Sequence, residues 1–448
     1  MKKIAIIGAG PTGLGAAFRL RELDHDNFKV FERNAYPGGL CASFRDAGGF
    51  TWDLGGHVIF SHYKYFDSFF DGVLKGGYFT HKRNAWIRSK GRWIPYPFQN
   101  HIKYLPKAII DECVESLKEK RIKPRGRINF KEWLIYAFGK GFTRHFFSPY
   151  NLKVWGFPLE ELSVDWVGER ISRVQLKDVI RHLLSDTDLS DWGPNALFKY
   201  PAQGGVGEIF RKASVILDKK IRFNSEVVRI ERKKKRIYFS DNSQETYEAL
   251  INTGPLNKLL HFIDGCPKRL LSAANELRHN GVFVVGIGIQ RPCPSDKCWM
   301  YFPDSNSPFF RVTYLSNYSP RNVPDSNKYY SLLCESAYSK YKKEKKSEIL
   351  NNTIKGLINS GIIGKFEKKH IVSTFVFDID YAYPIPTIKR DMALREIQPA
   401  LEKMGIYSRG RFGSWRYEIG NTDHSFLQGK EVIDRLVNNT RERVWGNG

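Results

Sequence analysis

Cysteine and long hydrophobic runs are scarce in this sequence. Its 448 residues include six cysteines, which form no CxxC pair and no Cys/His spacing typical of a metal site. No run reaches the about 18 consecutive apolar residues that indicate a membrane-spanning helix. Glycines interrupt the apolar stretch that follows Met1, so this stretch does not resemble a signal peptide. We therefore expect reduced thiols, no bound metal, no insertion into a membrane and a cytoplasmic location.

The motifs of several common catalytic classes are also missing. The sequence contains no G-x-S-x-G elbow, no phosphate-binding P-loop and no HExxH motif. No cysteine and histidine pattern suggests a nucleophile with its base, and no acidic pair marks a glycosidase. If this chain is an enzyme, a bound cofactor must supply the reactive atom.

Basic residues outnumber acidic ones, with 71 Lys and Arg against 47 Asp and Glu, which gives a formal net charge of +24. A nucleic-acid surface is one interpretation, and a lysine-rich solvated surface is the other. The densest basic run, 232–236, separates two strand-like segments and so predicts a hairpin turn. A second run, 342–346, precedes a helix-like stretch. Because neither run is a basic tail, we expect a solvated surface and no nucleic-acid partner.

The start of the chain carries an informative motif. An apolar strand at 4–7 leads into a G-x-G-x-x-G turn made by Gly8, Gly10 and Gly13, then a helix and a second strand that ends at Glu32. Gly8 permits the tight turn, Gly10 lets the backbone approach a pyrophosphate, and Gly13 lets helix and strand pack closely. The helix N-terminus offers free N–H groups to phosphates, and the Glu32 carboxylate can accept hydrogen bonds from a ribose. This combination predicts a bound dinucleotide.

The order of patterns along the chain predicts a discontinuous fold. One strand–turn–helix unit cannot complete a doubly wound domain, so later strands and the last helix must return to it. Between them, Asn129 and Glu132 have the spacing of a capping box for a helix over 130–138. Such a plan favours FAD over NAD as the ligand. We predict an α/β fold with a discontinuous Rossmann-like FAD-binding domain (1–80, 200–265 and 400–448), an inserted helical domain (101–190) and an inserted antiparallel β-sheet domain (81–100 and 270–395).

Several segments carry candidate chemistry, and each has a structural alternative. Gly55-Gly56-His57 makes a loop that can pass close to a flat ligand, or a tight turn with a buried histidine. The segments 96–100 and 149–155 combine aromatic rings with amides, which can hold a base or simply pack. Arg170 and Arg311 lie among apolar neighbours and need an anion, either a diphosphate or a buried carboxylate.

These strings resemble those of the UDP-galactopyranose mutases, of the kind found in fungi and trypanosomatids. The matching segments are 8–17, 55–66, 95–100, 149–155, 166–170, 192–196, 296–303, 316–320, 408–421 and 423–426. The resemblance implies a three-domain flavoenzyme of galactofuranose biosynthesis that interconverts UDP-galactopyranose and UDP-galactofuranose. In that family N5 of reduced FAD attacks the anomeric carbon without net redox, after NADPH or NADH has reduced the flavin.

The same resemblance implies a partner and leaves some properties open. UDP-galactose is the expected substrate, although related mutases act on deoxy or acetamido sugars. The basic run at 342–346 and the short C-terminal tail depart from the family, so a homo-oligomer stays open.

The resemblance also implies residue roles by position. It assigns catalysis to Gly56 and His57 in the loop over the flavin and to Arg170 and Arg311 as a diphosphate clamp. It assigns substrate binding to Arg83, Tyr96, Phe98, Gln99, Asn151, Trp155, Asn195, Trp299, Tyr301, Tyr318, Tyr383 and Tyr417. It assigns flavin contacts to Gly8, Gly10, Thr12, Gly13, Glu32, Arg33, Gly39, Leu40, Gly55, Val228, Arg411, Gly420, Asn421, Thr422 and Ser425. Among these, Arg411 is expected to offset negative charge on a reduced flavin.

Two other functions stay as alternatives. A redox flavoenzyme of the amine-oxidase or phytoene-desaturase type shares the nucleotide-binding domain, but it would not need two arginines and several tyrosines around a diphosphate. A non-catalytic protein that binds flavin or nucleic acid is motivated only by the net charge.

Overall fold

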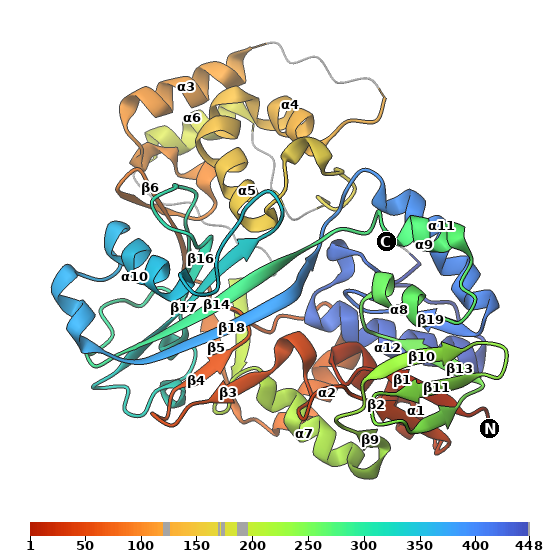
Figure 1. Cartoon of the computed structure of the whole chain (residues 1–448). Coiled ribbons are helices and arrows are strands. Elements are labelled where there is room, and N and C mark those ends of the chain that lie inside the picture. Colours follow the sequence, from red (N-terminus) through yellow and green to blue (C-terminus); the bar gives the residue numbers. More distant parts are fainter. Residues whose placement is uncertain (120–125, 169–170, 172–174, 186–195, 447–448) are drawn as a thin grey trace.

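A parallel sheet assembled from distant parts of the chain forms the base of the fold. The computed structural model describes residues 1–119, 126–168, 171, 175–185 and 196–446. The sheet has the order β19–β13–β1–β2–β9, and all its pairs are parallel. Its strands are β1 (Ile4–Ile7), β2 (Phe28–Phe31), β9 (Ile221–Arg222), β13 (Ala249–Asn252) and β19 (Ile406–Ser408). Red, green and blue segments therefore lie side by side in Figure 1.

Alternating side chains of this sheet pack against two separate layers. Ile4 and Ile6 belong to a core with α1 (Pro11–Glu22), α2 (Lys64–Leu74), α7 (Gly207–Leu217) and α12 (Thr422–Asn438). Ala5 and Leu250 belong to a second core on the opposite face. That core contains α8 (Leu256–Phe262), α9 (Lys268–Ala274), α11 (Arg390–Lys403) and a small sheet of β10 (Val227–Glu231), β11 (Arg236–Phe239) and β12 (Gln244–Thr246). Layers on both faces of a parallel sheet are typical of α/β proteins, and the predicted fold class is confirmed.

A second, larger sheet stands beside the parallel one (Figure 1). In order it contains β18 (Ile371–Pro384), β14 (His279–Ile289), β17 (Tyr330–Tyr338), β16 (Arg311–Tyr314), β15 (Trp299–Tyr301), β6 (Ala85–Ser89) and β7 (Arg92–Pro95). The sheet is antiparallel as predicted, except that β15 and β6 run parallel. A parallel pair cannot be joined by a hairpin, and β6 does come from a segment far from β15 in the sequence.

The two faces of this sheet pack against different parts of the protein. Val312 and Cys334 point into a core with α10 (Ile349–Asn359). Because side chains alternate along a strand, Arg311, Thr313 and Glu335 lie on the opposite face. Leu333 on that face belongs to the core that also contains β1 and α1. The face away from α10 is therefore directed toward the parallel sheet and its first turn.

The helical part lies above both sheets in Figure 1. It contains α3 (Lys107–Lys118), α4 (Phe130–Phe142), a π-helical turn (Thr143–Phe147), α5 (Ser148–Trp155) and α6 (Leu176–Leu184). The predicted capping box is confirmed, since the Asn129 side chain accepts from Glu132 N–H and the Glu132 carboxylate accepts from Asn129 N–H. Shorter strand pairs, β3 (Ser43–Arg45) with β4 (Thr51–Asp53) and β5 (Tyr78–Lys82) with β8 (Leu197–Pro201), connect the parts.

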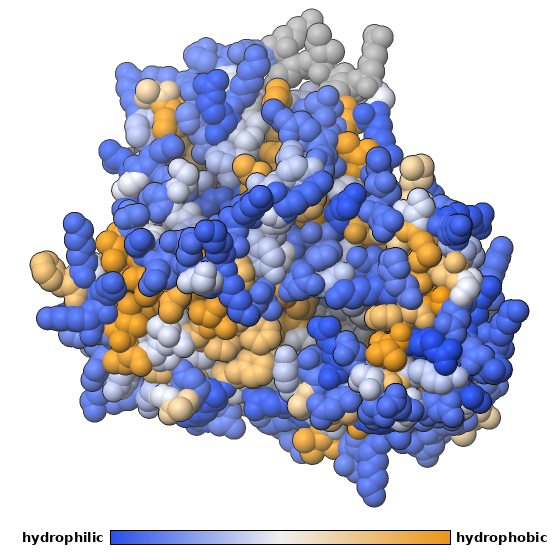
Figure 2. Space-filling view, viewed as in Figure 1, coloured by the Kyte–Doolittle hydropathy of each residue, from blue (hydrophilic) through white to orange (hydrophobic). Residues whose placement is uncertain are grey.

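The basic runs and the cysteines agree with the expectations from the sequence. Residues 232–235 form the turn between β10 and β11, and 342–346 precede α10. All six cysteines are free. The face in Figure 2 is mostly hydrophilic, with apolar side chains in separate patches. Within the described residues, no helix is both long and apolar enough to cross a membrane.

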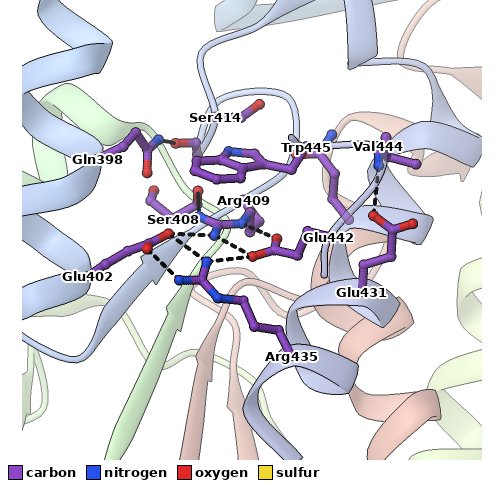
Figure 3. A network of polar contacts seen from close by, with 12 residues as sticks. Gln398, Glu402, Ser408, Arg409, Ser414, Glu431, Arg435, Glu442, Val444 and Trp445 are labelled. Atoms are coloured by element: carbon purple, nitrogen blue, oxygen red, sulfur yellow. Dashed lines mark hydrogen bonds and ion pairs between the residues drawn. The ribbon is translucent and has the colours of Figure 1, made fainter. Parts of the chain in front are cut away.

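A buried charge network fastens the end of the chain to the parallel sheet (Figure 3). Arg409, directly after β19, is fully buried and binds Glu442 through Nε (2.5 Å) and Nη2 (2.7 Å). Glu402 on α11 accepts from Arg409 Nη2 at 2.7 Å and from Arg435 of α12 at 2.7 Å. The Trp445 ring lies 3.7 Å from the Arg409 guanidinium carbon. Two arginines and two glutamates thus balance one another, with Arg409 and Glu442 fully buried and Arg435 partly exposed.

We predict that Arg409→Leu lowers the free energy of unfolding by about 3–5 kcal/mol, because it leaves a buried carboxylate without its main cation. Lys131→Leu is the control, since Lys131 and Glu160 form a half-exposed pair (2.6 Å) whose loss costs less than about 1 kcal/mol. Urea unfolding followed by circular dichroism measures both variants. Equal losses would contradict the importance of burial.

Candidate active site

The first turn has the geometry of a phosphate-binding loop. Gly8 has a φ of +100°, a conformation that side chains rarely adopt. A Cβ at Gly13 would overlap the carbonyl oxygen of Gly8, which explains the close packing of helix and turn. At Gly10, by contrast, a Cβ would meet no atom closer than 3.9 Å. The protein therefore leaves space in front of Gly10, beside the N-terminus of α1.

A second glycine turn and a second helix N-terminus meet this loop. Gly38 donates from its N–H to the carbonyl of Ala9 at 2.9 Å, and Gly39 begins a short 3-10 turn (Gly39–Cys41). The Cys41 thiol lies 3.6 Å from the hydroxyl of Thr422, the first residue of α12. α12 approaches α1 closely, because a Cβ at Gly15 or Gly429 would overlap the backbone of the other helix. The predicted flavin contacts in 8–13, 39–40 and 421–425 are thus brought together.

Glu32 is buried at the end of β2, but it already has partners within the turn. Its carboxylate accepts from Ala9 N–H at 2.8 Å and from Asn34 N–H at 2.9 Å. It therefore stabilises the turn itself, and its contact with a ribose stays a prediction. Arg33 is exposed, and Val228 lies at a β-bulge between β10 and β11 with 46 % of its surface exposed.

Arg411 places a cation between the two predicted sites. Its guanidinium carbon lies 5.0 Å from the Tyr383 ring and 5.9 Å from the Tyr417 ring. A Cβ at Gly420 would come within 3.2 Å of the Arg411 side chain. The buried Nε of Arg411 has no hydrogen-bond partner among the described residues. An unpaired cationic N–H at this place indicates room for an anionic or hydrogen-bonding ligand.

Arg311 and Glu335 form a buried ion pair at the centre of the second sheet. Both Nε and Nη2 of Arg311 donate to the Glu335 carboxylate, Nη2 at 2.7 Å. The Gly56 N–H donates to the same carboxylate at 3.2 Å. Burial opposes both charges, but their attraction raises the pKa of Arg311 and lowers the pKa of Glu335. Arg311 therefore has the buried carboxylate partner that the sequence left open, and the pair also holds the loop at Gly56, while a diphosphate contact of Arg311 stays a prediction.

His57 follows on that loop and is neutral near pH 7. Burial lowers its pKa to about 4; the Glu335 charge opposes this shift, and Arg311 and Arg411 add to it. The backbone N–H of His57 donates to the Gly55 carbonyl at 2.7 Å, and Gly55 has a φ of +129°. The buried Nδ1 has no hydrogen-bond partner among the described residues. His57 can therefore hydrogen-bond a ligand without carrying a charge.

Aromatic side chains from both inserted parts meet around Tyr301. The Tyr301 hydroxyl accepts from Trp299 Nε1 at 2.8 Å, and its ring lies 5.2 Å from Tyr96 and 5.4 Å from Tyr150. The Arg83 guanidinium carbon lies 5.2 Å from the Tyr96 ring and 5.0 Å from the Trp299 ring. Burial raises the pKa of Tyr96 to about 12, so its hydroxyl stays protonated. The predicted residues Arg83, Tyr96, Trp299 and Tyr301 thus form one group.

A second aromatic group joins α5 to the end of the chain. Trp155 lies 4.8 Å from the Tyr417 ring and 6.0 Å from the Tyr383 ring. The Asn151 amide accepts from Trp155 Nε1 at 3.2 Å and donates to the Phe147 carbonyl at 2.8 Å. Since Arg411 lies near both tyrosines, this group borders the predicted flavin site.

Three further predicted residues are buried. Phe98 is fully buried and stacks on Phe146 with ring centres 4.5 Å apart. Gln99 is also buried, and Tyr318 packs against the Tyr200 ring at 5.1 Å. Arg170 and Asn195 lie outside the described residues.

Sequence reasoning left two important carboxylates out of the site. Glu335 is the acidic residue in the buried strand β17, and a carboxylate in such a strand signals a buried cation nearby. Asp53 lies two residues before Gly55 and accepts from Ser43 (2.5 Å), Tyr200 (2.7 Å) and the Val206 N–H (3.1 Å). Burial raises the pKa of Asp53 to about 6. Asp53 thus fixes the chain just before the loop 55–57, and Glu335 binds the middle of that loop. We call this segment the histidine loop.

We predict that Gly56→Ala destabilises the protein by about 1–3 kcal/mol, the usual cost of inserting a group into a packed site. A Cβ at Gly56 would lie 2.6 Å from Thr313 Oγ1 and 3.3 Å from Arg311 Nε. The control is Gly72→Ala in α2, where a Cβ has no neighbour within 4 Å and alanine favours the helix. Thermal unfolding compares the two variants. A Gly56→Ala protein as stable as wild type would contradict the close packing of the loop at Gly56.

Comparison with known proteins agrees with this arrangement. Residues 11–387 match the family model described as flavin containing amine oxidoreductase. A short segment of 58 residues is 43% identical to a zeta-carotene-forming phytoene desaturase of Myxococcus xanthus. That segment covers 13% of this chain and only 11% of the desaturase.

Solved structures give a more specific likeness. A crystal structure of reduced UDP-galactopyranose mutase superposes with a TM-score of 0.95 and 41% sequence identity, covering 100% of this chain and 96% of that chain. Putrescine oxidase bound to putrescine has a TM-score of 0.67 at 15% identity, covering 98% of this chain and 99% of that chain, and so shares the fold alone. The chain therefore belongs to the flavin-containing amine oxidoreductases and, within them, to the UDP-galactopyranose mutase family.

Proposed function

We propose that this protein interconverts UDP-galactopyranose and UDP-galactofuranose. The observation that carries the proposal is the full-length likeness to reduced UDP-galactopyranose mutase at 41% identity. The site supports it, because the fold combines the dinucleotide turn with a buried arginine–glutamate pair, a neutral histidine and several tyrosines near Arg411. An amine oxidase or desaturase has no evident use for this collection of diphosphate-binding groups.

We propose FAD as the cofactor, held by the turn at 8–13, the second turn at 38–41 and the N-terminus of α12. The open space at Gly10 and the unpaired Nε of Arg411 fit such a ligand. When bound and reduced, the flavin would supply N5 as the nucleophile toward the anomeric carbon, without net redox. NADPH or NADH is the reductant that we propose. Arg411 would favour the reduced state by placing positive charge nearby.

In this proposal Arg311 binds the diphosphate of the substrate. The Glu335 carboxylate accepts from Nε–H and from one N–H of Nη2. The N–H groups of Nη1 and the second N–H of Nη2 are therefore left for another acceptor. The carboxylate fixes the guanidinium plane, but it also cancels part of the positive charge. A second cation is therefore useful when the sugar–diphosphate bond breaks, and we propose Arg170 for this role.

His57 and the aromatic groups would orient the rest of the substrate. Because His57 is neutral, we propose that it hydrogen-bonds sugar hydroxyls rather than stabilising charge. The rings of Tyr96 and Trp155 offer flat surfaces for the uracil, and Asn151 lies on the same helix as Trp155. These buried rings would also exclude water that could hydrolyse a displaced sugar.

The deciding assay incubates the reduced protein with UDP-galactofuranose under anaerobic conditions and separates the products by chromatography. We expect UDP-galactopyranose as the product. One equivalent of NADPH or NADH should support many turnovers, because the flavin stays reduced at the end of each reaction. The oxidised protein should be inactive. Stoichiometric consumption of reductant or oxygen, or no change of the sugar ring, would favour a redox flavoenzyme instead.

We predict that Arg311→Ala lowers turnover at least about a hundredfold and leaves the flavin bound, because it removes a proposed transition-state contact on the second sheet, whereas the turn at Gly8 follows a strand of the parallel sheet. Arg321→Ala is the matched control, since this exposed arginine contacts Gln203 at the surface and should behave as wild type. Turnover per bound flavin is the measurement. Wild-type turnover per flavin in Arg311→Ala would exclude the proposed role.

A further inference from the structure

Two histidines and a buried aspartate form a compact cluster beside the histidine loop. His62 Nδ1 lies 2.8 Å from Asp423 Oδ2, and His424 Nδ1 lies 3.0 Å from Asp423 Oδ1. The backbone N–H of His62 donates to the same carboxylate at 3.2 Å. One nitrogen or oxygen atom from each of the three residues lies within 4.8 Å of the other two. Neither the dinucleotide turn nor the proposed substrate contacts use these side chains.

The cluster combines burial with access from solvent. The Asp423 side chain is 1% exposed, whereas His62 is 43% and His424 is 17% exposed. Within the described residues, Asp423 pairs with these two histidines and with no lysine or arginine. A buried carboxylate between two imidazoles has a place for a cation that solvent can deliver.

The rings are held in place by their neighbours. The ring centres of His62 and His424 lie 5.3 Å apart, and the ring planes form an angle of 63°. Tyr63 packs edge-on against His424, with ring centres 5.3 Å apart. Phe60 packs against His62 at 5.7 Å. Such support limits the side-chain entropy that is lost when ligands are fixed around an ion.

The ligand types select the kind of ion. Two imidazoles and one carboxylate suit divalent transition metals such as Zn²⁺, Co²⁺ or Ni²⁺, whereas Mg²⁺ and Ca²⁺ prefer oxygen. Tetrahedral zinc ligands lie about 3.3 Å from each other, given bonds of about 2.0 Å. The present spacing of at most 4.8 Å is therefore up to about 1.5 Å wider than in a closed tetrahedral site, and binding requires a shift of the half-exposed His62 side chain.

We propose that His62, Asp423 and His424 bind one divalent transition-metal ion, with water completing the coordination. The inference does not depend on the reaction, because it rests on these three side chains alone. His62 follows the histidine loop and Asp423 lies in the first turn of α12. A bound ion thus connects the end of that loop to the helix at the predicted flavin site.

The test measures binding of Zn²⁺ to the flavin-loaded, tag-free full chain by competition with a chromophoric chelator. We expect one equivalent with micromolar or tighter affinity, and Co²⁺ in its place should give d–d absorption bands of a four- or five-coordinate ion. His62→Gln and His424→Gln should each weaken binding at least about tenfold. His261→Gln, an exposed histidine on α8, is the control and should bind as wild type.

Circular dichroism and flavin content verify that each variant is folded, and the exposed His62 is the variant least able to disturb the core. If Asp423→Asn does not fold, the two histidine variants decide the question. Binding that is absent at tens of micromolar Zn²⁺, or that is unchanged in His62→Gln and His424→Gln, would overturn the proposal.

Discussion

The ion pair between Arg311 and Glu335 organises the site, because it neutralises a buried carboxylate with a largely buried guanidinium. The pair forms across neighbouring strands β16 and β17, at positions directly opposite in the register. In the described part of the chain, its carboxylate accepts one further hydrogen bond, from the Gly56 N–H, so the loop that carries His57 rests on the same group that orients the arginine. Mutual attraction keeps both charged despite desolvation, whereas His57 beside them loses its charge. One electrostatic contact therefore sets the charge state, orientation and loop geometry together.

This arrangement requires two sheets with different chemistry to meet. The parallel sheet supplies backbone N–H groups at the Gly8 turn and at α12, which need no side-chain charge to receive a phosphate. The second sheet supplies charged and aromatic side chains on the face opposite α10. Contact between them brings Arg411, from the C-terminal segment, against Tyr383 of β18. The dinucleotide turn and the residues proposed to bind the diphosphate thus come from separate layers and meet where the layers touch.

Local features were predictable because they depend on neighbours in the chain. The Gly8–Gly13 turn, the capping box at Asn129 and the hairpin after β10 each follow from residue types at fixed spacing, and all three are present. The family could be inferred because long strings of the sequence resemble it. Glu335 escaped notice because a single carboxylate in an apolar strand indicates a nearby cation but not which residue supplies it. Its partner, Arg311, is 24 residues away, and only strand pairing brings the two charges together. Likewise, the sequence could not distinguish a ribose contact from a turn contact for Glu32, which the fold has given to Ala9 and Asn34.

The sequence by itself determined the fold class, the dinucleotide turn and the set of arginines, tyrosines and histidine from which a site can be made. It also indicated that the surplus of basic residues covers a surface rather than forming a tail. Only the tertiary structure decided which anion Arg311 faces, that His57 is neutral, and that Asp423 gathers two histidines from separate segments. The reason is physical: residue type fixes what a side chain can donate or accept, but burial and the distance to an opposite charge fix its charge and partner. Those two quantities exist only after the sheets have packed.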